Sequence, residues 1–380
     1  MIALCAAYFV ANLSWTLSPF QFPTFSTESG FGPVSAGWIL SCDILSAALV
    51  SIGIGYMSRR RATRGVLCAA ASLIILCAVV SVFLPSFRWI LLCRIVSGAA
   101  TGVLLAGVSS AVAQLDEPET RYGHMNGFMN LSGFLLVLVT PMVLGYLSFH
   151  RAIFAVIAVV ALMSVPAIAI YPIKTSVYAA AGSGRGMSGL HGWLLCAAVF
   201  IFSIVGGSLY AVTEVVGEIM HVTGTALGVG IAVQATGAVI GSYIAGWLDR
   251  RLGSYGGALL AAAGITTAVA LFAYGQGAVA FDVANLLFGA SGYFGFTICL
   301  GLAAKVDASG SCAAAATGAF YLAGGVGPLI GGVELDWNRG GIGIFLWSTS
   351  IFMSAFFFLY WLIKRSASVS VDASIPVPSA

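Results

Sequence analysis

The sequence predicts an all-α integral membrane protein with twelve membrane-spanning helices in two parallel, pseudo-symmetric six-helix bundles. Of its 380 residues, 60% are hydrophobic and only 8% are charged, and the mean hydropathy is +1.02, which excludes a soluble domain of this length. Apolar runs of about 20 residues, the length that crosses a bilayer, follow one another along the chain. A short cationic turn also occurs twice, at Gly55–Arg60 and at Gly246–Gly253, which indicates a repeat with an offset of 246 − 55 = 191 residues.

Charged residues and Gly or Pro separate the apolar runs and so define the spans. We expect helices rather than barrel strands, because barrel strands would alternate in polarity and lipid-exposed backbone must satisfy its own hydrogen bonds. The predicted spans are residues 2–24, 34–57, 65–84, 88–113, 122–147, 151–172, 191–216, 225–248, 255–274, 278–302, 309–333 and 341–363. They divide the chain into an N-terminal bundle (1–173), a cytoplasmic linker (174–190), a C-terminal bundle (191–364) and a disordered cytoplasmic tail (365–380).

The positions of Lys and Arg test this count, because positive charge concentrates on the cytoplasmic side of a membrane protein. Twelve spans place both termini on one side, together with most of the cations. Cations expected on that side are Arg59, Arg60, Arg61, Arg64, Arg121, Lys174, Arg185, Arg250, Arg251, Lys305, Lys364 and Arg365, and those opposite are Arg88, Arg151 and Arg339. The sequence therefore predicts a multi-pass protein of the plasma or inner membrane with cytoplasmic termini.

The remaining composition excludes several kinds of partner. The eight cysteines lie in apolar spans without a CxxC pair, so we interpret them as small core residues. The four histidines are single and lie near span ends, so no metal site is expected. We expect no cofactor and no nucleic acid. The expected partners are the lipid bilayer, a small solute and protons, and the expected state is a monomer.

The second copy of the cationic turn contains Gly246, Asp249, Arg250, Arg251 and Gly253. Twelve helices in two parallel halves, with this turn after the second helix of each half, resemble the major facilitator superfamily over nearly the whole chain. In that family the loop after helix 2, and its equivalent after helix 8, acts as a cytoplasmic latch whose Asp and Arg pair with each other and with neighbouring helix ends. The resemblance implies a latch made of Gly55, Arg59, Arg60, Gly246, Asp249, Arg250 and Arg251.

The two copies of the turn are unequal. Ser58 occupies the place that Asp249 has in the second copy, so Arg59 and Arg60 have no acidic partner within their turn. We therefore expect Asp249→Asn to impair transport more than any change at Ser58. The alternative is that both arginine clusters only set the orientation in the membrane.

A second resemblance lies in the predicted helix 11. Gly327, Pro328 and Gly331 are similar to a Gly-Pro-rich pattern that antiporters of the family have in helix 5, where this chain has Pro141. Because the match lies in the other half, it does not indicate an antiporter. Small residues let helices approach closely and proline makes a bend point, so tight packing and a hinge are both compatible with the pattern.

Two ionisable residues, Asp43 and Arg94, fall well inside predicted spans. Such a residue costs about 2.5 to 3.5 kcal/mol at mid-bilayer and needs a partner or a watery cavity. Both lie at comparable depth in helices of the same direction, so they can pair. Arg94 with Gly98 and Gly102 resembles the family's helix 4, where the arginine is linked to proton coupling or anion binding. Asp43 and Arg94 are thus candidates for proton coupling, and a structural salt bridge is the alternative.

Helices 1, 4, 7 and 10 line the solute cavity in that family, and polar or aromatic side chains on them are candidates to contact solute. Packing or an interfacial position is the alternative for each. Asn285 is the uncharged counterpart of Arg94, so proton chemistry is expected to differ between the halves. The candidates on these helices are Tyr8, Asn12, Trp15, Tyr210 and Asn285. Gln234, an uncompensated amide in helix 8, is a further candidate, which either lines the cavity or bonds a neighbouring helix.

The leading hypothesis is a proton-coupled secondary transporter that moves a small organic solute by rocking two halves around a site at mid-membrane. An uncoupled facilitator is the alternative if Asp43 only forms a structural bridge. An integral-membrane enzyme would need clustered nucleophiles, bases or metal ligands near one membrane face. The sequence has no such cluster, so no catalytic residues and no enzyme activity are expected.

Overall fold

The computed structural model describes residues 1–372, apart from residues 24, 26–28, 30, 32, 58–62, 145–148, 171–189, 223–224, 308 and 338–342. Some further helical residues, among them Pro141 and Pro328, are described by their backbone only. The predicted linker at 174–190 therefore lies outside the described residues except for Leu190. So do Arg59 and Arg60 of the first latch copy.

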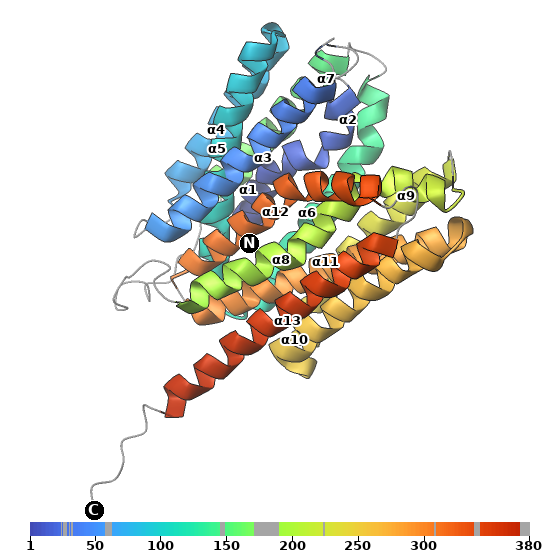
Figure 1. Cartoon of the computed structure of the whole chain (residues 1–380). Helices are drawn as coiled ribbons and strands as arrows, with labels where there is room; N and C mark the ends of the chain where they lie inside the picture. The colour runs from blue at the N-terminus through green and yellow to red at the C-terminus, as the bar shows by residue number, and fades with distance from the viewer. Residues whose placement is uncertain are drawn as a thin grey trace, which may run out of the picture.

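All regular structure in the described residues is helical (Figure 1). The N-terminal half contains α1 (Ile2–Thr16), α2 (Ser18–Pro23), α3 (Pro33–Met57), α4 (Arg64–Phe83), α5 (Phe87–Ala113), α6 (Pro118–Leu144) and α7 (Phe149–Ile170). The C-terminal half contains α8 (Leu190–Ala211), α9 (Thr213–Ile219), α10 (Thr225–Tyr274), α11 (Gly277–Val306), α12 (Ser311–Trp337) and α13 (Gly343–Asp372).

These helices make the twelve predicted spans. The first span is broken at Leu17 into α1 and α2, and the seventh is broken at Val212 into α8 and α9. Conversely, α10 contains two spans, because the chain reverses at Gly253 with φ 67° and ψ 162°, a conformation that glycine adopts without a steric penalty. Seven helical segments among the described residues are apolar and long enough to cross a bilayer, one of them the 49-residue segment Ala226–Tyr274.

The last helix corrects one sequence prediction. The disordered tail was expected from residue 365, but α13 continues to Asp372. Neither glycine nor proline interrupts residues 365–372, and the first proline after them is Pro376. Nothing in this stretch therefore breaks the helix.

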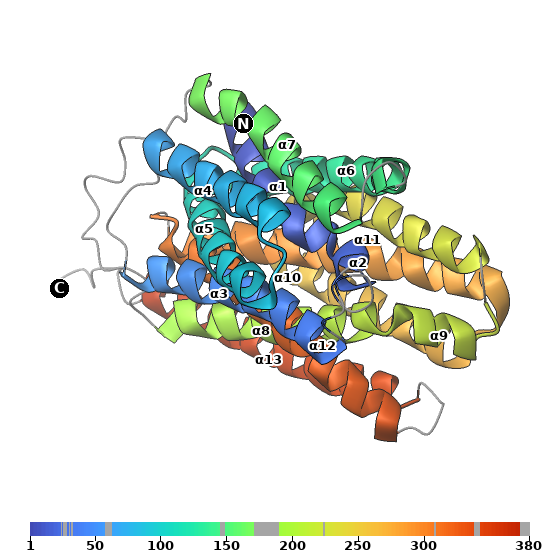
Figure 2. The same cartoon turned by 90° about the horizontal axis from the view of Figure 1, so that it is seen from above.

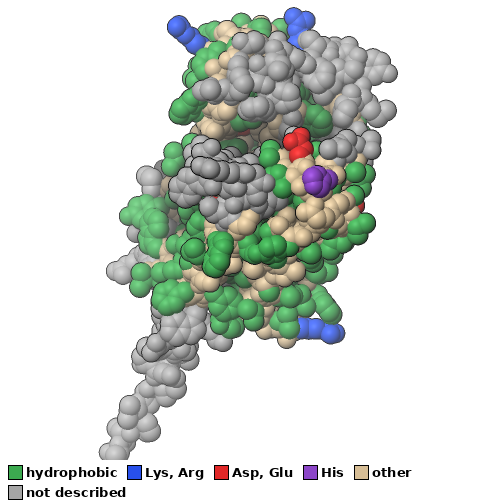
Figure 3. Space-filling model, turned by 45° about the vertical axis from the view of Figure 1, so that its right-hand side comes forward, with side chains coloured by type: hydrophobic (Ala, Val, Ile, Leu, Met, Phe, Trp, Pro, Cys, Tyr) green, Lys and Arg blue, Asp and Glu red, His purple; other side chains and the backbone are tan. Residues whose placement is uncertain are grey.

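The helices form two groups that correspond to the two halves of the sequence (Figures 1 and 2). The main contacts between the halves join α3 to α12 and α6 to α10. Hydrophobic side chains cover much of the face shown in Figure 3, and the Lys and Arg side chains in view lie at its upper and lower edges. This distribution suits a protein that is surrounded by lipid.

The sequence repeat is also a repeat of contacts between the halves. A Cβ added at Gly55 would lie 2.7 Å from the Ser311 carbonyl oxygen, and one added at Gly246 would lie 2.6 Å from Thr120 Oγ1. Ser311 and Thr120 are themselves 191 residues apart. Each half therefore places the glycine of its turn against the first residues of a helix in the other half. We call the end of the molecule where these contacts lie the latch side.

Candidate functional site

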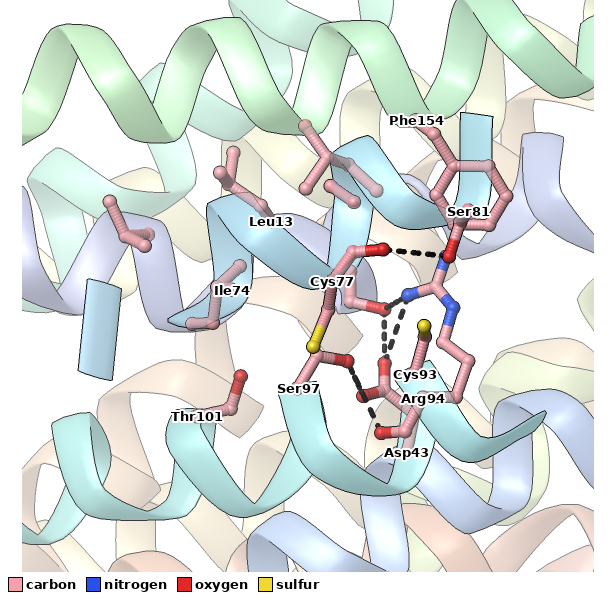
Figure 4. Close-up of a pocket in the computed structure, with 14 residues that line it drawn as sticks. Leu13, Asp43, Ile74, Cys77, Ser81, Cys93, Arg94, Ser97, Thr101 and Phe154 are labelled. Atoms are coloured by element: carbon pink, nitrogen blue, oxygen red, sulfur yellow. Dashed lines mark hydrogen bonds and ion pairs between the residues drawn. The ribbon is translucent and has the colours of Figure 1, made fainter. Parts of the chain in front are cut away.

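Asp43 on α3 and Arg94 on α5 form an ion pair inside the N-terminal half. Arg94 Nη1 lies 3.3 Å from Asp43 Oδ2, and the side chains are 4% and 7% exposed. Figure 4 shows the carboxylate and the guanidinium pointing toward one another. Asp43 and Arg94 lie at comparable depth in the sequence prediction, and in the structure they do pair. Their opposite charges compensate each other away from water.

Glycines on α5 bring the two helices close enough for this pair. A Cβ at Gly98 would clash with the Asp43 carbonyl oxygen and with Ser46 Oγ. A Cβ at Gly102 would lie 2.5 Å from the Ala47 carbonyl oxygen. The small-residue stripe after Arg94 therefore packs directly on α3, so that the arginine one turn earlier meets the aspartate.

Two serines satisfy the carboxylate and one nitrogen of the guanidinium, whereas Arg94 Nε and Nη2 are buried without a hydrogen-bond partner among the described residues. Ser14 on α1 donates to Asp43 Oδ2 and accepts from Arg94 Nη1 at 2.7 Å. Ser97 on α5 donates to Asp43 Oδ1 at 3.2 Å. The carboxylate is therefore held by three helices, and each of its oxygens has a donor.

The guanidinium also lies against aromatic rings, and a small cavity adjoins it. Arg94 Cζ is 4.9 Å from the ring centre of Phe154 and 5.8 Å from that of Phe25, which are cation–π distances. The cavity beside Ser14, Asp43 and Arg94 has a volume of about 20 Å³, room for about one water molecule. It is too small for an organic solute.

The predicted solute-cavity residues of helix 1 lie where the halves meet. The Tyr321 hydroxyl of α12 donates to Asn12 Oδ1. The Trp15 ring stacks on Tyr210 of α8, with ring centres 6.3 Å apart and planes at 21°, and meets Tyr321 edge-on. Tyr8 is buried like Asn12 and Tyr321, and its side chain hydrogen-bonds Asn12 from within the core. Asn12, Trp15, Tyr210 and Tyr321 thus form one aromatic and amide cluster between the halves.

Gln234 and Asn285 occupy the equivalent places in the C-terminal half. They lie 191 residues after Asp43 and Arg94. A Cβ at Gly289 would clash with the Gln234 carbonyl oxygen, as one at Gly98 would with that of Asp43. Asn285 is fully buried and donates to the Phe281 carbonyl at 2.9 Å, while Asn285 Oδ1 and Gln234 Oε1 are buried without a hydrogen-bond partner. The C-terminal half therefore has two neutral amides where the N-terminal half has an ion pair.

The second latch copy shows one part of the expected pairing. The resemblance implied that its Asp and Arg pair with each other and with neighbouring helix ends. Asp249 and Arg250 do not pair with each other, because consecutive helical residues do not face one another, but both contact neighbouring helix ends. Asp249 Oδ2 instead lies 3.2 Å from Lys305 Nζ on α11. Arg250 contacts Glu117 Oε2 at 3.2 Å and Thr120 at 2.9 Å, both in the other half. Arg251 lies over the Trp247 ring at 4.4 Å.

A second ion pair joins the halves at this point. Lys305 also pairs with Glu119, in the first turn of α6. Together these groups line a cavity of about 210 Å³ on the latch side. Lys305 thus links an acid of its own half to an acid of the other half.

The predicted glycines of helix 11 have a packing contact in the structure. A Cβ at Gly327 would lie 2.6 Å from the Ser208 nitrogen on α8, and one at Gly331 would clash with the Ser208 carbonyl oxygen. Pro141 and Pro328 lie within α6 and α12, and their side chains are outside the described part of the structure. The contacts favour tight packing of α12 on α8 at these two glycines.

Sequence reasoning missed several residues of these sites. Ser97 follows Arg94 by three positions, so helical spacing could have found it. Ser14, which meets the ion pair, and Tyr321, which meets Asn12, have no such signal, because each lies on a helix that is distant in sequence from its partner. Lys305 was considered only as a cytoplasmic cation and Glu119 was not singled out, because only the assembled fold brings the two together.

Comparisons with solved structures find the same fold in three proteins. The chain is similar to the E. coli fucose:proton symporter FucP (TM-score 0.72, 13% identity, 95% of this chain and 97% of that one). It is similar to the proton:xylose symporter XylE bound to 6-bromo-6-deoxy-D-glucose (TM-score 0.74, 14% identity, 95% and 94%). It is also similar to the human organic anion transporter TETRAN (TM-score 0.70, 16% identity, 94% and 98%). At these identities the likeness shows the fold.

The family follows from the sequence itself. No curated protein matches the chain. Residues 4–332, which include both latch copies and the Asp43 and Arg94 pair, match the family described as Major Facilitator Superfamily. Since this match spans most of the chain and the two-bundle fold agrees with it, the protein belongs to the Major Facilitator Superfamily of transporters.

Proposed function

We propose that the protein is a proton-coupled secondary transporter that moves a small organic solute by alternating access. The observation that supports coupling is the ion pair of Asp43 and Arg94, which is buried in one half beside a cavity of about 20 Å³. The repeat and the contacts between halves support a rocking motion. Two observations of different kinds thus support the two parts of the proposal.

Asp43 is proposed as the group that carries the proton. Ionised Asp43 is attracted to Arg94, whereas a proton on the carboxylate removes that attraction and leaves the arginine positive. Proton binding and release would therefore change the contact that α1 makes with α3 and α5. A water in the adjoining cavity could deliver the proton and take it back.

The solute is proposed to bind at the aromatic and amide cluster between the halves. Aromatic faces and a few placed polar groups are typical of small-molecule sites. Asn12, Trp15, Tyr210 and Tyr321 offer stacking surfaces together with hydroxyl and amide groups. The similar structures named above are transporters of fucose, xylose and organic anions, so monosaccharides and carboxylates come first in a screen.

The latch side is proposed to be cytoplasmic, in the plasma or inner membrane, with both termini on it and the protein acting as a monomer. The excess of Lys and Arg on that side supports this orientation. The contacts between Gly55 and Ser311 and between Gly246 and Thr120 then describe a transporter closed toward the cytoplasm.

Uptake into proteoliposomes tests the proposal. Monosaccharides, carboxylates, amino acids and aromatic cations would be screened with and without an inward proton gradient. We expect the gradient to drive accumulation in the wild type and not in Asp43→Asn, with exchange of the same solute retained. Glu218→Gln, an exposed carboxylate on α9, is the control and should behave as wild type.

Two results would decide against coupling. Wild-type uptake that ignores the proton gradient would make the protein a facilitator. Gradient-driven accumulation that survives in Asp43→Asn would make the ion pair structural and leave the proton route elsewhere.

A further inference from the structure

Ser14 connects the ion pair to a third helix. Its hydroxyl accepts from Arg94 Nη1 at 2.7 Å and donates to Asp43 Oδ2, while the direct distance from Nη1 to Oδ2 is 3.3 Å. Asp43 and Arg94 lie on α3 and α5, which Gly98 and Gly102 hold in close contact. Ser14 lies on α1 and is partly exposed. Its hydroxyl is therefore a link between the pair and an element outside that tightly packed unit.

The same turn of α1 contacts the other half of the protein. Trp15 stacks on Tyr210, and a Cβ at Gly324 would lie 2.9 Å from the Trp15 ring. Asn12 accepts a hydrogen bond from Tyr321. Successive helical residues point about 100° apart, so Ser14 faces the ion pair while Trp15 faces α8 and α12. The helix ends directly after, at Thr16.

We infer that Ser14 is the positioning residue through which the protonation of Asp43 is transmitted along α1 to the contact between the two halves. The inference rests on the proposed function. It adds the element that links the proton site to the solute cluster, which a buried ion pair alone does not supply.

The step requires only a proton. A proton from water binds Asp43 Oδ2, and on release it returns to water. While Asp43 is ionised, Ser14 donates to Oδ2 and accepts from Arg94. Once Oδ2 carries the proton, it is a donor too, so Ser14 faces two donors and its own hydroxyl hydrogen must turn away. The contact that holds α1 against α3 and α5 is then rearranged.

Other titratable groups lie near Asp43 and are part of any response to pH. Arg94 is the charged one, and the rest are neutral at ordinary pH. Among the described residues they are Cys42 on α3, Cys77 on α4, Cys93 on α5 and Tyr321 on α12.

The distance between the halves, measured as a function of pH without any solute, tests this inference. Nitroxide labels at Arg88→Cys and Gln276→Cys, both exposed and in different halves, report that distance by pulsed electron resonance. The background would have Cys5, Cys42 and Cys68 replaced by alanine, because the other five cysteines are buried. The probe is the proton alone, supplied as acidic or mildly alkaline buffer to the purified full-length protein.

Ser14→Ala and Ser97→Ala form the matched pair of variants. Both remove a hydroxyl that donates to Asp43, but Ser97 lies on α5 with Arg94, and its hydrogen bonds are to Asp43 Oδ1 and the Arg94 carbonyl rather than to α1. We expect the shift of the distance distribution with pH to be lost in Ser14→Ala and kept in Ser97→Ala. Ser14→Thr retains the hydroxyl and should keep the shift, which separates the role of the hydroxyl from a fault in folding.

A pH shift in Ser14→Ala equal to that of wild type would overturn the inference. The inference would also be overturned if the wild type accumulated a solute along a proton gradient but showed no change of the inter-label distance with pH; the proposed function would then stand. If the wild type showed no gradient-driven uptake, the proposed function would fail, and the inference would fail with it.

Discussion

Asp43 and Arg94 differ in what each can do without its partner. A buried carboxylate can become neutral by binding a proton, whereas a guanidinium stays charged. Breaking a buried pair from one side costs about 3 to 5 kcal/mol when the remaining charge cannot be neutralised. We therefore expect Asp43→Asn to lower the unfolding temperature more than Arg94→Gln, as measured by thermal unfolding of the detergent-purified protein at neutral pH.

The double variant is the control for that comparison. Asp43→Asn with Arg94→Gln leaves no uncompensated charge, so it should unfold at a higher temperature than Asp43→Asn alone. The Arg94 side chain is 4% exposed, which indicates a buried charge. Equal unfolding temperatures for the two single variants would contradict this and would mean that water reaches Arg94.

Among the helices, α3 and α5 are joined by a contact that tolerates no side chain at Gly98. A Cβ there meets the Asp43 backbone, which cannot rotate aside. Overpacking of this kind costs about 1 to 3 kcal/mol, and it would also separate Asp43 from Arg94. We expect Gly98→Ala to lower thermal stability and to weaken gradient-driven uptake together.

Gly53→Ala on α3 is the matched control, because nothing lies within 4 Å of a Cβ at that position. Alanine is a better helix former than glycine by about 1 kcal/mol, so Gly53→Ala should be neutral or stabilising. If Gly98→Ala behaved in the same way, the close approach of α3 and α5 would not be needed for the pair.

The helices also show what the sequence could and could not predict. Apolar run length and charge breaks predicted twelve spans, because lipid imposes both on the chain. The breaks at Leu17 and Val212 were not predicted: Pro19, which follows Leu17, was assigned to a continuous first span, and Val212 is neither a glycine nor a proline. Comparable depth showed that Asp43 and Arg94 can pair, and the structure shows that they do. Ser14 could not, because the face that α1 turns toward the pair depends on the packing of the whole bundle.

At the scale of the whole molecule, the two halves repeat their geometry but not their charges. Gly55 and Gly246 make equivalent contacts with the other half. Glu119, which pairs with Lys305, has Gly310 as its counterpart 191 residues later, and Glu117 has Ala308. The second latch thus meets acids at the start of α6, while the first latch has none at the equivalent positions. The two latch copies therefore differ in charge twice: within the turn, where Ser58 corresponds to Asp249, and in the opposite half, where Ala308 and Gly310 correspond to Glu117 and Glu119.

Glu119 and Glu117 allow this unequal latch to be tested. The Glu119 side chain is 14% exposed and pairs with Lys305, and a Cβ at Gly301 would lie 2.5 Å from Glu119 Cγ. Glu117 is 65% exposed and pairs with Arg250. A surface pair contributes about 0 to 1 kcal/mol, so Glu117→Gln should change little. Loss of about 1 kcal/mol at Glu119 would raise the population open on the latch side about fivefold.

A thiol at the contact between the halves can report that opening. Thr317 is fully buried and bonds Ser109 of the other half at 2.7 Å, so Thr317→Cys becomes reactive only when the halves separate there. With this reporter in every sample, we expect Glu119→Gln to speed alkylation by a membrane-impermeant maleimide added on the latch side, and Glu117→Gln to leave the rate unchanged. Equal rates in both variants would mean that close packing at Gly55 and Gly246, rather than charge, holds the latch side closed.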